Sequence, residues 1–176
     1  MRDYMKRAAR IVRFAAVATG AAMLMSAPAL AARGGFPEAT RAYDAGDHGA
    51  AAAIWHDLAA DCDAGSRMAL AGLYHAGLGV PQNDVEALRW YLMAAWAGNR
   101  YAQQVAGDWY ASGDIVPVDR VRAAFWLTLA AGQGLAGAAG RRDAALATLD
   151  RSERDALAGR LDAYSSIAAG MCARIR

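Results

Sequence analysis

The chain has 176 residues, enough for one modest domain, and 56% of them are hydrophobic. Five tryptophans and an aromatic content of 9% supply enough large side chains for a packed core, which excludes an intrinsically disordered chain. The formal net charge is +2, but five of the 19 basic residues and one of the 17 acidic residues precede residue 32. The remaining 14 basic and 16 acidic residues give about −2, so net charge provides no case for nucleic-acid binding.

Residues 1–31 have the three parts of a secretory signal peptide. The basic residues of the head are Arg2, Lys6, Arg7, Arg10 and Arg13. An apolar run from Phe14 to Met25 follows, and Ala29 and Ala31 form the small pair before the expected cut near Ala31. A retained membrane anchor is the alternative, but these 12 residues fall short of the roughly 18–20 that span a bilayer. We therefore expect a periplasmic or secreted protein with no stable membrane span after cleavage, and a linker at 32–36.

The two cysteines, Cys62 and Cys172, leave their pairing open. An exported chain meets an oxidising compartment, which permits a disulfide within or between chains. In a linear stack of helices the two positions lie near opposite ends, whereas a bridge needs Cα atoms within about 7 Å. An internal bridge therefore requires the C-terminal helix to fold back.

A pattern of 36 residues occurs twice. Residues 66–101 align without gaps with residues 102–137 and share ten identities, which include tyrosine, tryptophan, proline and glycine as well as alanine. A period of this length is typical of helical solenoids. The sequence thus predicts a repeat at 66–101 and another at 102–137.

Each repeat is predicted to contain two helices. The expected helices are residues 66–76, 84–97, 102–112 and 120–133. Gly77 and Gly113 follow the first helix of each pair, where glycine is the usual C-terminal cap. Asn83 and Asp119 precede the second helix and fit as N-caps.

Related segments flank the two full copies. Residues 37–65 read as a shortened first repeat, in which Tyr43 and Trp55 take the places of Tyr74 and Trp90. Residues 138–170 are predicted to form two C-terminal capping helices, which solenoids need to cover their last apolar face. A tail follows at 171–176. The predicted fold class is therefore all-α, an α/α solenoid of tandem helix pairs.

These residues resemble the Sel-one-like repeat, a relative of the tetratricopeptide repeat. The matching framework positions are Tyr43, Trp55, Tyr74, Gly77, Trp90, Gly98, Tyr110, Gly113, Trp126 and Gly134. Ile115 departs from the pattern, because the family usually has glycine there, so that loop is expected to differ. The resemblance implies a superhelix that serves mostly as an adaptor in protein complexes. A penicillin-binding branch has paired cysteines within each repeat, which this chain lacks, so that activity is not carried over.

No catalytic or metal-binding signature stands out. None of the three histidines, His48, His56 and His75, has the i,i+4 partner of a helical metal site. The polar cluster around His56 and Cys62, with three aspartates, reads as a solvated helix end rather than a metal site. We expect no cofactor and no catalytic residue.

The leading hypothesis is a non-catalytic periplasmic interaction module that binds a protein or peptide on its concave face. First helices line that face in stacks of this type, so positions where the copies differ are the candidates for partner binding: Arg67, His75, Gln103, Gln104, Asp108, Trp109 and Ser112. The alternatives are an envelope enzyme acting on peptidoglycan or a β-lactam through an unrecognised site, and a structural subunit that stacks on other repeats.

Overall fold

The helix boundaries in the centre of the chain follow the 36-residue period. In the computed structural model, which describes residues 35–167, α4 covers Ala64–Ala76 and α5 covers Asp84–Trp96. Thirty-six residues later, α6 covers Arg100–Ser112 and α7 covers Arg120–Gly132. All four helices have 13 residues, and every boundary lies within two residues of its predicted position.

The predicted caps are present in both copies. The side chains of Asn83 and Asp119 accept hydrogen bonds from the backbone N–H three residues later, at 3.0 and 2.8 Å. Gly77 and Gly113 have φ angles of 69° and 79°, in the left-handed region that side chains disfavour. Polar caps and glycines therefore fix the ends of each helix locally.

The loop within each pair differs between the copies, as the sequence predicts. Gly79 has a φ of 70°, and a Cβ there would lie 2.3 Å from the backbone carbon of His48. At the equivalent position stands Ile115, whose backbone is outside the left-handed region. The loop at Gly79 can thus approach α3 closely because it has no side chain, and the loop at Ile115 takes another path.

Four further helices flank the two full repeats: α2 at Phe36–Asp44, α3 at His48–Ala60, α8 at Ala138–Ala147 and α9 at Arg151–Ile167. Residues 35–167 thus contain eight helices and no strand, which confirms the all-α prediction. Within the same residues, none of the helices combines the length and the apolar character that crossing a bilayer requires. The predicted signal peptide, Cys172 and the tail at 171–176 lie outside the described residues.

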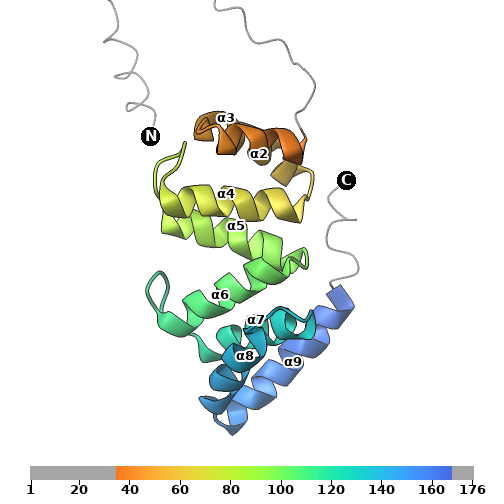
Figure 1. Ribbon diagram of the computed structural model, residues 1–176. Helices are drawn as coiled ribbons and strands as arrows, with labels where there is room; N and C mark the ends of the chain where they lie inside the picture. Colours follow the sequence, from red (N-terminus) through yellow and green to blue (C-terminus); the bar gives the residue numbers. More distant parts are fainter. Residues whose placement is uncertain (1–34, 168–176) are drawn as a thin grey trace, which may run out of the picture. The chain divides into compact units, whose positions relative to one another are not determined.

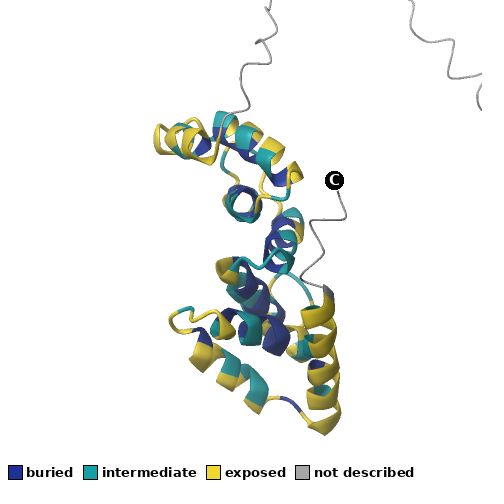
Figure 2. Ribbon diagram, turned by 90° about the vertical axis from the view of Figure 1, so that its right-hand side faces the viewer, coloured by how far each residue is buried: buried dark blue, intermediate teal, exposed yellow. Residues whose placement is uncertain are grey.

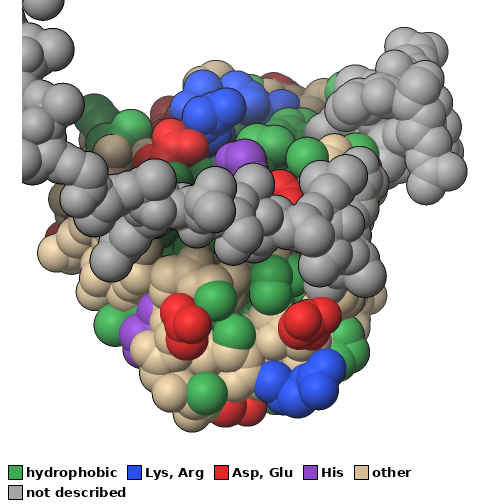
Figure 3. All heavy atoms as spheres, turned by 90° about the horizontal axis from the view of Figure 1, so that it is seen from above, with side chains coloured by type: hydrophobic (Ala, Val, Ile, Leu, Met, Phe, Trp, Pro, Cys, Tyr) green, Lys and Arg blue, Asp and Glu red, His purple; other side chains and the backbone are tan. Residues whose placement is uncertain are grey.

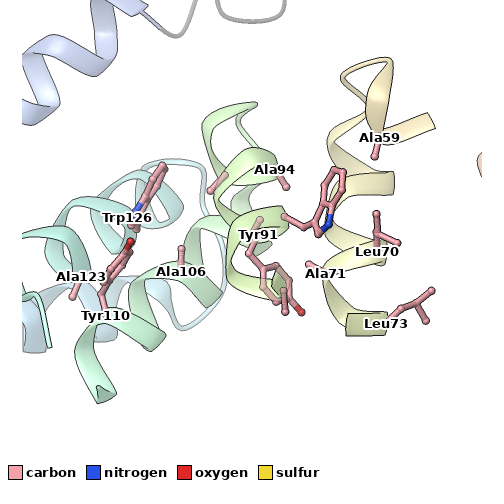
Figure 4. Close-up of a cluster of buried hydrophobic side chains, with 14 of the residues drawn as sticks. Ala59, Leu70, Ala71, Leu73, Tyr91, Ala94, Ala106, Tyr110, Ala123 and Trp126 are labelled. Carbon is pink, nitrogen blue, oxygen red and sulfur yellow. The ribbon is translucent and has the colours of Figure 1, made fainter. Parts of the chain in front are cut away.

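The helices pack in chain order from α2 to α8, and α9 then returns to pack against α7 (Figure 1). Buried residues run through the interior of the stack, while the outward side of α9 is exposed (Figure 2). Alanines such as Ala71, Ala94 and Ala106 are fully buried where helices meet, and larger side chains including Tyr110 and Trp126 lie between them (Figure 4). Small residues at the contacts let the helices approach closely.

Candidate partner-binding surface

Arg67 and Gln103, two of the predicted partner-binding residues, lie inside the stack with exposures of 6% and 0%. Arg67 Nε donates to the carbonyl of Ala59 at 3.0 Å, and Gln103 Nε2 donates to the carbonyl of Ala95 at 3.1 Å. Each acceptor lies in the last turn of the preceding second helix. The prediction that these residues present a recognition surface is wrong, because both clamp successive repeats together through equivalent hydrogen bonds.

His75 and Trp109 come together on neighbouring first helices, α4 and α6. Their ring centroids are 5.3 Å apart, and His75 Nδ1 lies 2.6 Å from the carboxylate of Asp84. The ring of Tyr91 contacts the same indole in a T-shaped arrangement, with centroids 5.3 Å apart. Trp109 is half-buried, so it both fills the space between repeats and presents part of its ring outward.

The other predicted residues lie on α6. Gln104 and Asp108 are half-buried and Ser112 is exposed. The carboxylate of Asp108 forms an ion pair with Arg141 of α8. Asp108 therefore bridges two successive first helices, and no sequence pattern indicates Arg141 as its partner.

The first helices α2 and α4 enclose an apolar groove of about 440 Å³, here called the aromatic groove. Its lining residues are Phe36, Tyr43, Trp55, Gly65, Met68, Ala69, Gly72, Leu73, Ala76, Leu78 and Tyr91. Phe36 and Tyr43 remain 41% and 37% exposed. No charged side chain lines the groove, so its chemistry suits an apolar ligand.

A second groove, here called the arginine groove, has a volume of about 380 Å³ and lies between α6 and α8 over α7. Its lining residues are Asp108, Ala111, Val118, Arg120, Ala123, Leu127, Arg141, Ala144, Ala145 and Thr148. Both arginines are paired, Arg141 with Asp108 and Arg120 with Glu153 of α9 at 2.8 Å. The floor is apolar while the rim carries balanced charges.

The predicted framework aromatics divide into two groups. Trp55, Trp90, Tyr110 and Trp126 are buried, with exposures of 8% or less, whereas Tyr74 is half-buried. Tyr43 is more exposed than a framework residue should be, because α2 is the first described helix and has no earlier described pair packed on it. The sequence pattern identified Tyr43 but not its place in a groove.

One buried tyrosine and the surface charges determine the electrostatics of this region. Burial raises the pKa of Tyr91 above its usual 10.0, so its hydroxyl stays neutral at physiological pH. Viewed from the α2–α3 end, the visible surface carries separate acidic and basic groups among hydrophobic and other atoms (Figure 3). Among residues 35–167, no group of three His, Cys, Asp or Glu side chains is placed to hold a metal ion.

Comparison with known proteins finds a repeat family that matches part of this chain, and solved structures of similar fold. Residues 65–99 and 100–135 each match the Sel1 repeat, the Sel-one-like repeat that the sequence resembles. A protective antigen present in uropathogenic Escherichia coli strains, displaying an SLR fold, matches with a TM-score of 0.67 and 21% identity, over 80% of this chain and 31% of that one. A Sel1 repeat protein from Oxalobacter formigenes matches with a TM-score of 0.57 and 29% identity, over 61% and 44%. The chain thus spans less than half of either protein. No curated protein sequence matches it.

Proposed function

Since this chain carries Sel1 repeats, and Sel1-repeat proteins generally mediate protein–protein interactions, we propose that it is a non-catalytic adaptor of the bacterial envelope. Its partner binds the face formed by the first helices α2, α4, α6 and α8. The sequence of residues 1–31 supports export, because it has the basic head, apolar run and small-residue end of a signal peptide.

The aromatic groove is the observation that carries this proposal. Phe36 and Tyr43 expose large rings to solvent beside a hollow of about 440 Å³. Exposed aromatics beside a pocket are frequent anchor points of protein interfaces, because burying them gains much area at little entropic cost. The lining comes from two successive repeats, since Trp55 of α3 and Leu73 of α4 both belong to it. The surface therefore spans more than one repeat.

The lining chemistry specifies the class of partner. Because no charged side chain lines the groove, an inserted charge would lose water without gaining a counter-ion. The partner segment in the aromatic groove is therefore an apolar stretch of polypeptide.

Site-specific photo-crosslinking in cells tests the proposal. A photoreactive amino acid at position 43 should crosslink one discrete partner, because that side chain lines the aromatic groove. The control is position 85 on α5, where Val85 is 70% exposed and lies outside both grooves. Equal crosslinking from both positions, or crosslinking from position 85 alone, would contradict the proposal.

A further inference from the structure

A third pocket, here called the guanidinium pocket, lies where α5, α6, α7 and α9 meet and shares no lining residue with either groove. Its volume is about 280 Å³, and aromatic rings form much of its wall. Tyr110, Phe125 and Trp126 are buried, with exposures of 6%, 3% and 2%, while Trp96 is half-buried. The rings of Trp96 and Trp126 pack in a T-shape with centroids 4.9 Å apart. Rings packed edge to face in this way form a fixed apolar wall.

Arg122 of α7 is held at one side of the guanidinium pocket by two neighbours. Its Nε lies 3.2 Å from the carboxylate of Asp119, and its Nη1 donates to the hydroxyl of Tyr110 at 3.4 Å. The guanidinium also lies over the ring of Tyr110, 5.3 Å from the ring centroid. These contacts orient the guanidinium and leave further N–H donors for a ligand.

Arg160 of α9 supplies the second positive charge that lines the pocket. Leu157, three residues earlier, is buried. The ring of Tyr164, four residues later, has its centroid 5.6 Å from that of Trp96 and 5.7 Å from that of Phe125. Residues three and four apart lie on one face of a helix, so the packing of α9 brings Arg160 to the pocket. Within the described part of the chain, no carboxylate forms an ion pair with Arg160 and none lines the pocket.

The repeat framework does not require this arrangement. Thirty-six residues before Arg122 and Phe125 stand Glu86 and Arg89, whose charged groups pair with each other at 3.1 Å. The preceding repeat thus folds with an ion pair at these positions. Helix packing alone therefore does not explain an aromatic pocket lined by two arginines.

The lining residues define the charge and the size of a ligand. Because Asp119 already neutralises Arg122, the lining carries one uncompensated positive charge, that of Arg160. A carboxylate is singly charged at neutral pH, so it balances this charge, and its two oxygens match the planar guanidinium in bidentate geometry. The volume is about twice that of an apolar cavity that holds benzene, so one ring or two fused rings fit against the aromatic wall.

We propose that the guanidinium pocket binds a small aromatic carboxylate, with its rings against Trp96 and Trp126 and its carboxylate between Arg122 and Arg160. This site is separate from the aromatic groove, which no charged side chain lines, and it does not depend on partner binding there. Because one arginine belongs to α7 and the other to α9, the bound carboxylate joins the C-terminal helix to the second full repeat.

Nuclear magnetic resonance of the isotope-labelled full-length chain tests the proposal. Each of the five tryptophans has its own indole N–H signal. The signals of Trp96 and Trp126 report the guanidinium pocket, whereas that of Trp55 reports the aromatic groove. Titration with 2-naphthoate should shift the first two signals, with a Kd on the order of 1 mM or below, and leave that of Trp55 unchanged. The neutral analogue 2-naphthamide should bind at least about tenfold more weakly.

Two arginine variants of α9 provide the matched comparison. Arg160 is exposed, so Arg160→Gln should keep the fold and weaken 2-naphthoate binding about tenfold. Arg151→Gln removes an exposed arginine from the same helix outside the pocket and should leave the Kd unchanged. The proposal is overturned if both variants lose affinity equally, or if 2-naphthamide binds as tightly as 2-naphthoate. It is also overturned if only the Trp55 signal responds, or if no signal shifts at about 10 mM 2-naphthoate.

Discussion

Replacing Gln103 by alanine tests whether this variable position is a structural clamp. Gln103 is fully buried, donates to the carbonyl of Ala95 at 3.1 Å, and accepts a hydrogen bond from Gln133 at 2.8 Å. Its amide also hydrogen-bonds with Tyr164 of α9. One side chain therefore contacts α5, the end of α7 and α9.

The expected cost follows from these contacts. Each lost hydrogen bond contributes about 1 kcal/mol, and each buried methylene about 0.8 kcal/mol. The carbonyl of Ala95 keeps a second donor, the N–H of Gly98, and Gln133 is exposed enough to bind water, so neither group bears the full penalty of burial without a partner. Gln103→Ala should thus lower the free energy of unfolding by about 3 kcal/mol.

The matched control is the neighbouring glutamine. Gln104→Ala removes the same side chain from the same helix at a half-buried position, and it should cost less than about 1 kcal/mol. Urea unfolding followed by circular dichroism measures both values. If the two variants lose equal stability, or if Gln103→Ala loses partner binding without losing stability, the assignment of Gln103 as a clamp is wrong.

Three further predictions follow from the packing and from the titration of a buried tyrosine. Trp90→Ala should cost about 3–5 kcal/mol in urea unfolding, because the indole is only 8% exposed; a cost below about 1 kcal/mol would contradict its place in the core. Gly107→Ala should lower the free energy of unfolding by about 1–3 kcal/mol, since its Cβ would lie 2.6 Å from Leu127 Cγ. The control Gly132→Ala meets no atom within 4 Å and should raise the free energy of unfolding by about 0.5 kcal/mol. Changes of the same sign in the two variants would refute the close approach at Gly107. Burial raises the pKa of Tyr164 above 10.0, and the hydrogen bond with Gln103 acts in the opposite direction. The tyrosine therefore loses its proton at lower pH in the unfolded chain than in the folded one, so stability falls as pH rises past 10. Tyr164→Phe should weaken this fall in urea midpoints measured from pH 8 to 11, and an unchanged pH dependence would contradict the prediction.

Local signals account for how well the helices could be predicted. Asn83 and Asp119 cap the N-termini of their helices. Gly77 and Gly113 end helices with a left-handed backbone, so a few adjacent residues determine each helix boundary. The 36-residue register then repeats those boundaries. At Ile115 the absence of the usual glycine predicted a different loop, and the backbone there is indeed outside the left-handed region that Gly79 adopts.

The role of variable positions could not be predicted in this way. Arg67 and Gln103 occupy equivalent positions but differ in charge and shape, and this difference was the reason to predict that both bind a partner. Both nevertheless extend a donor to the carbonyl at the end of the preceding helix, and the sequence does not show that this carbonyl lies within reach. A sequence difference between repeats therefore does not indicate a partner-binding position where two different side chains can make the same hydrogen bond.

The aromatic groove and the return of α9 also depend on tertiary packing. Phe36 was assigned to the linker and Tyr43 to the framework, because sequence alone does not show which side of α2 remains uncovered. Likewise, the apolar side of α9 indicates that the helix packs, but not that it packs against α7 and contacts Trp96. Long-range placement determines both features.

The most direct test of the proposed function is the affinity of the crosslinked partner for two purified variants. Tyr43→Ser removes an aromatic side chain from the groove, and Val85→Ser removes an exposed apolar side chain from α5 outside it. Titration calorimetry, with thermal unfolding as a check on folding, should show at least a tenfold loss of affinity for Tyr43→Ser, about 1.4 kcal/mol, and no change for Val85→Ser. Wild-type affinity in a folded Tyr43→Ser protein, or an equal loss in both variants, would contradict partner binding at the aromatic groove.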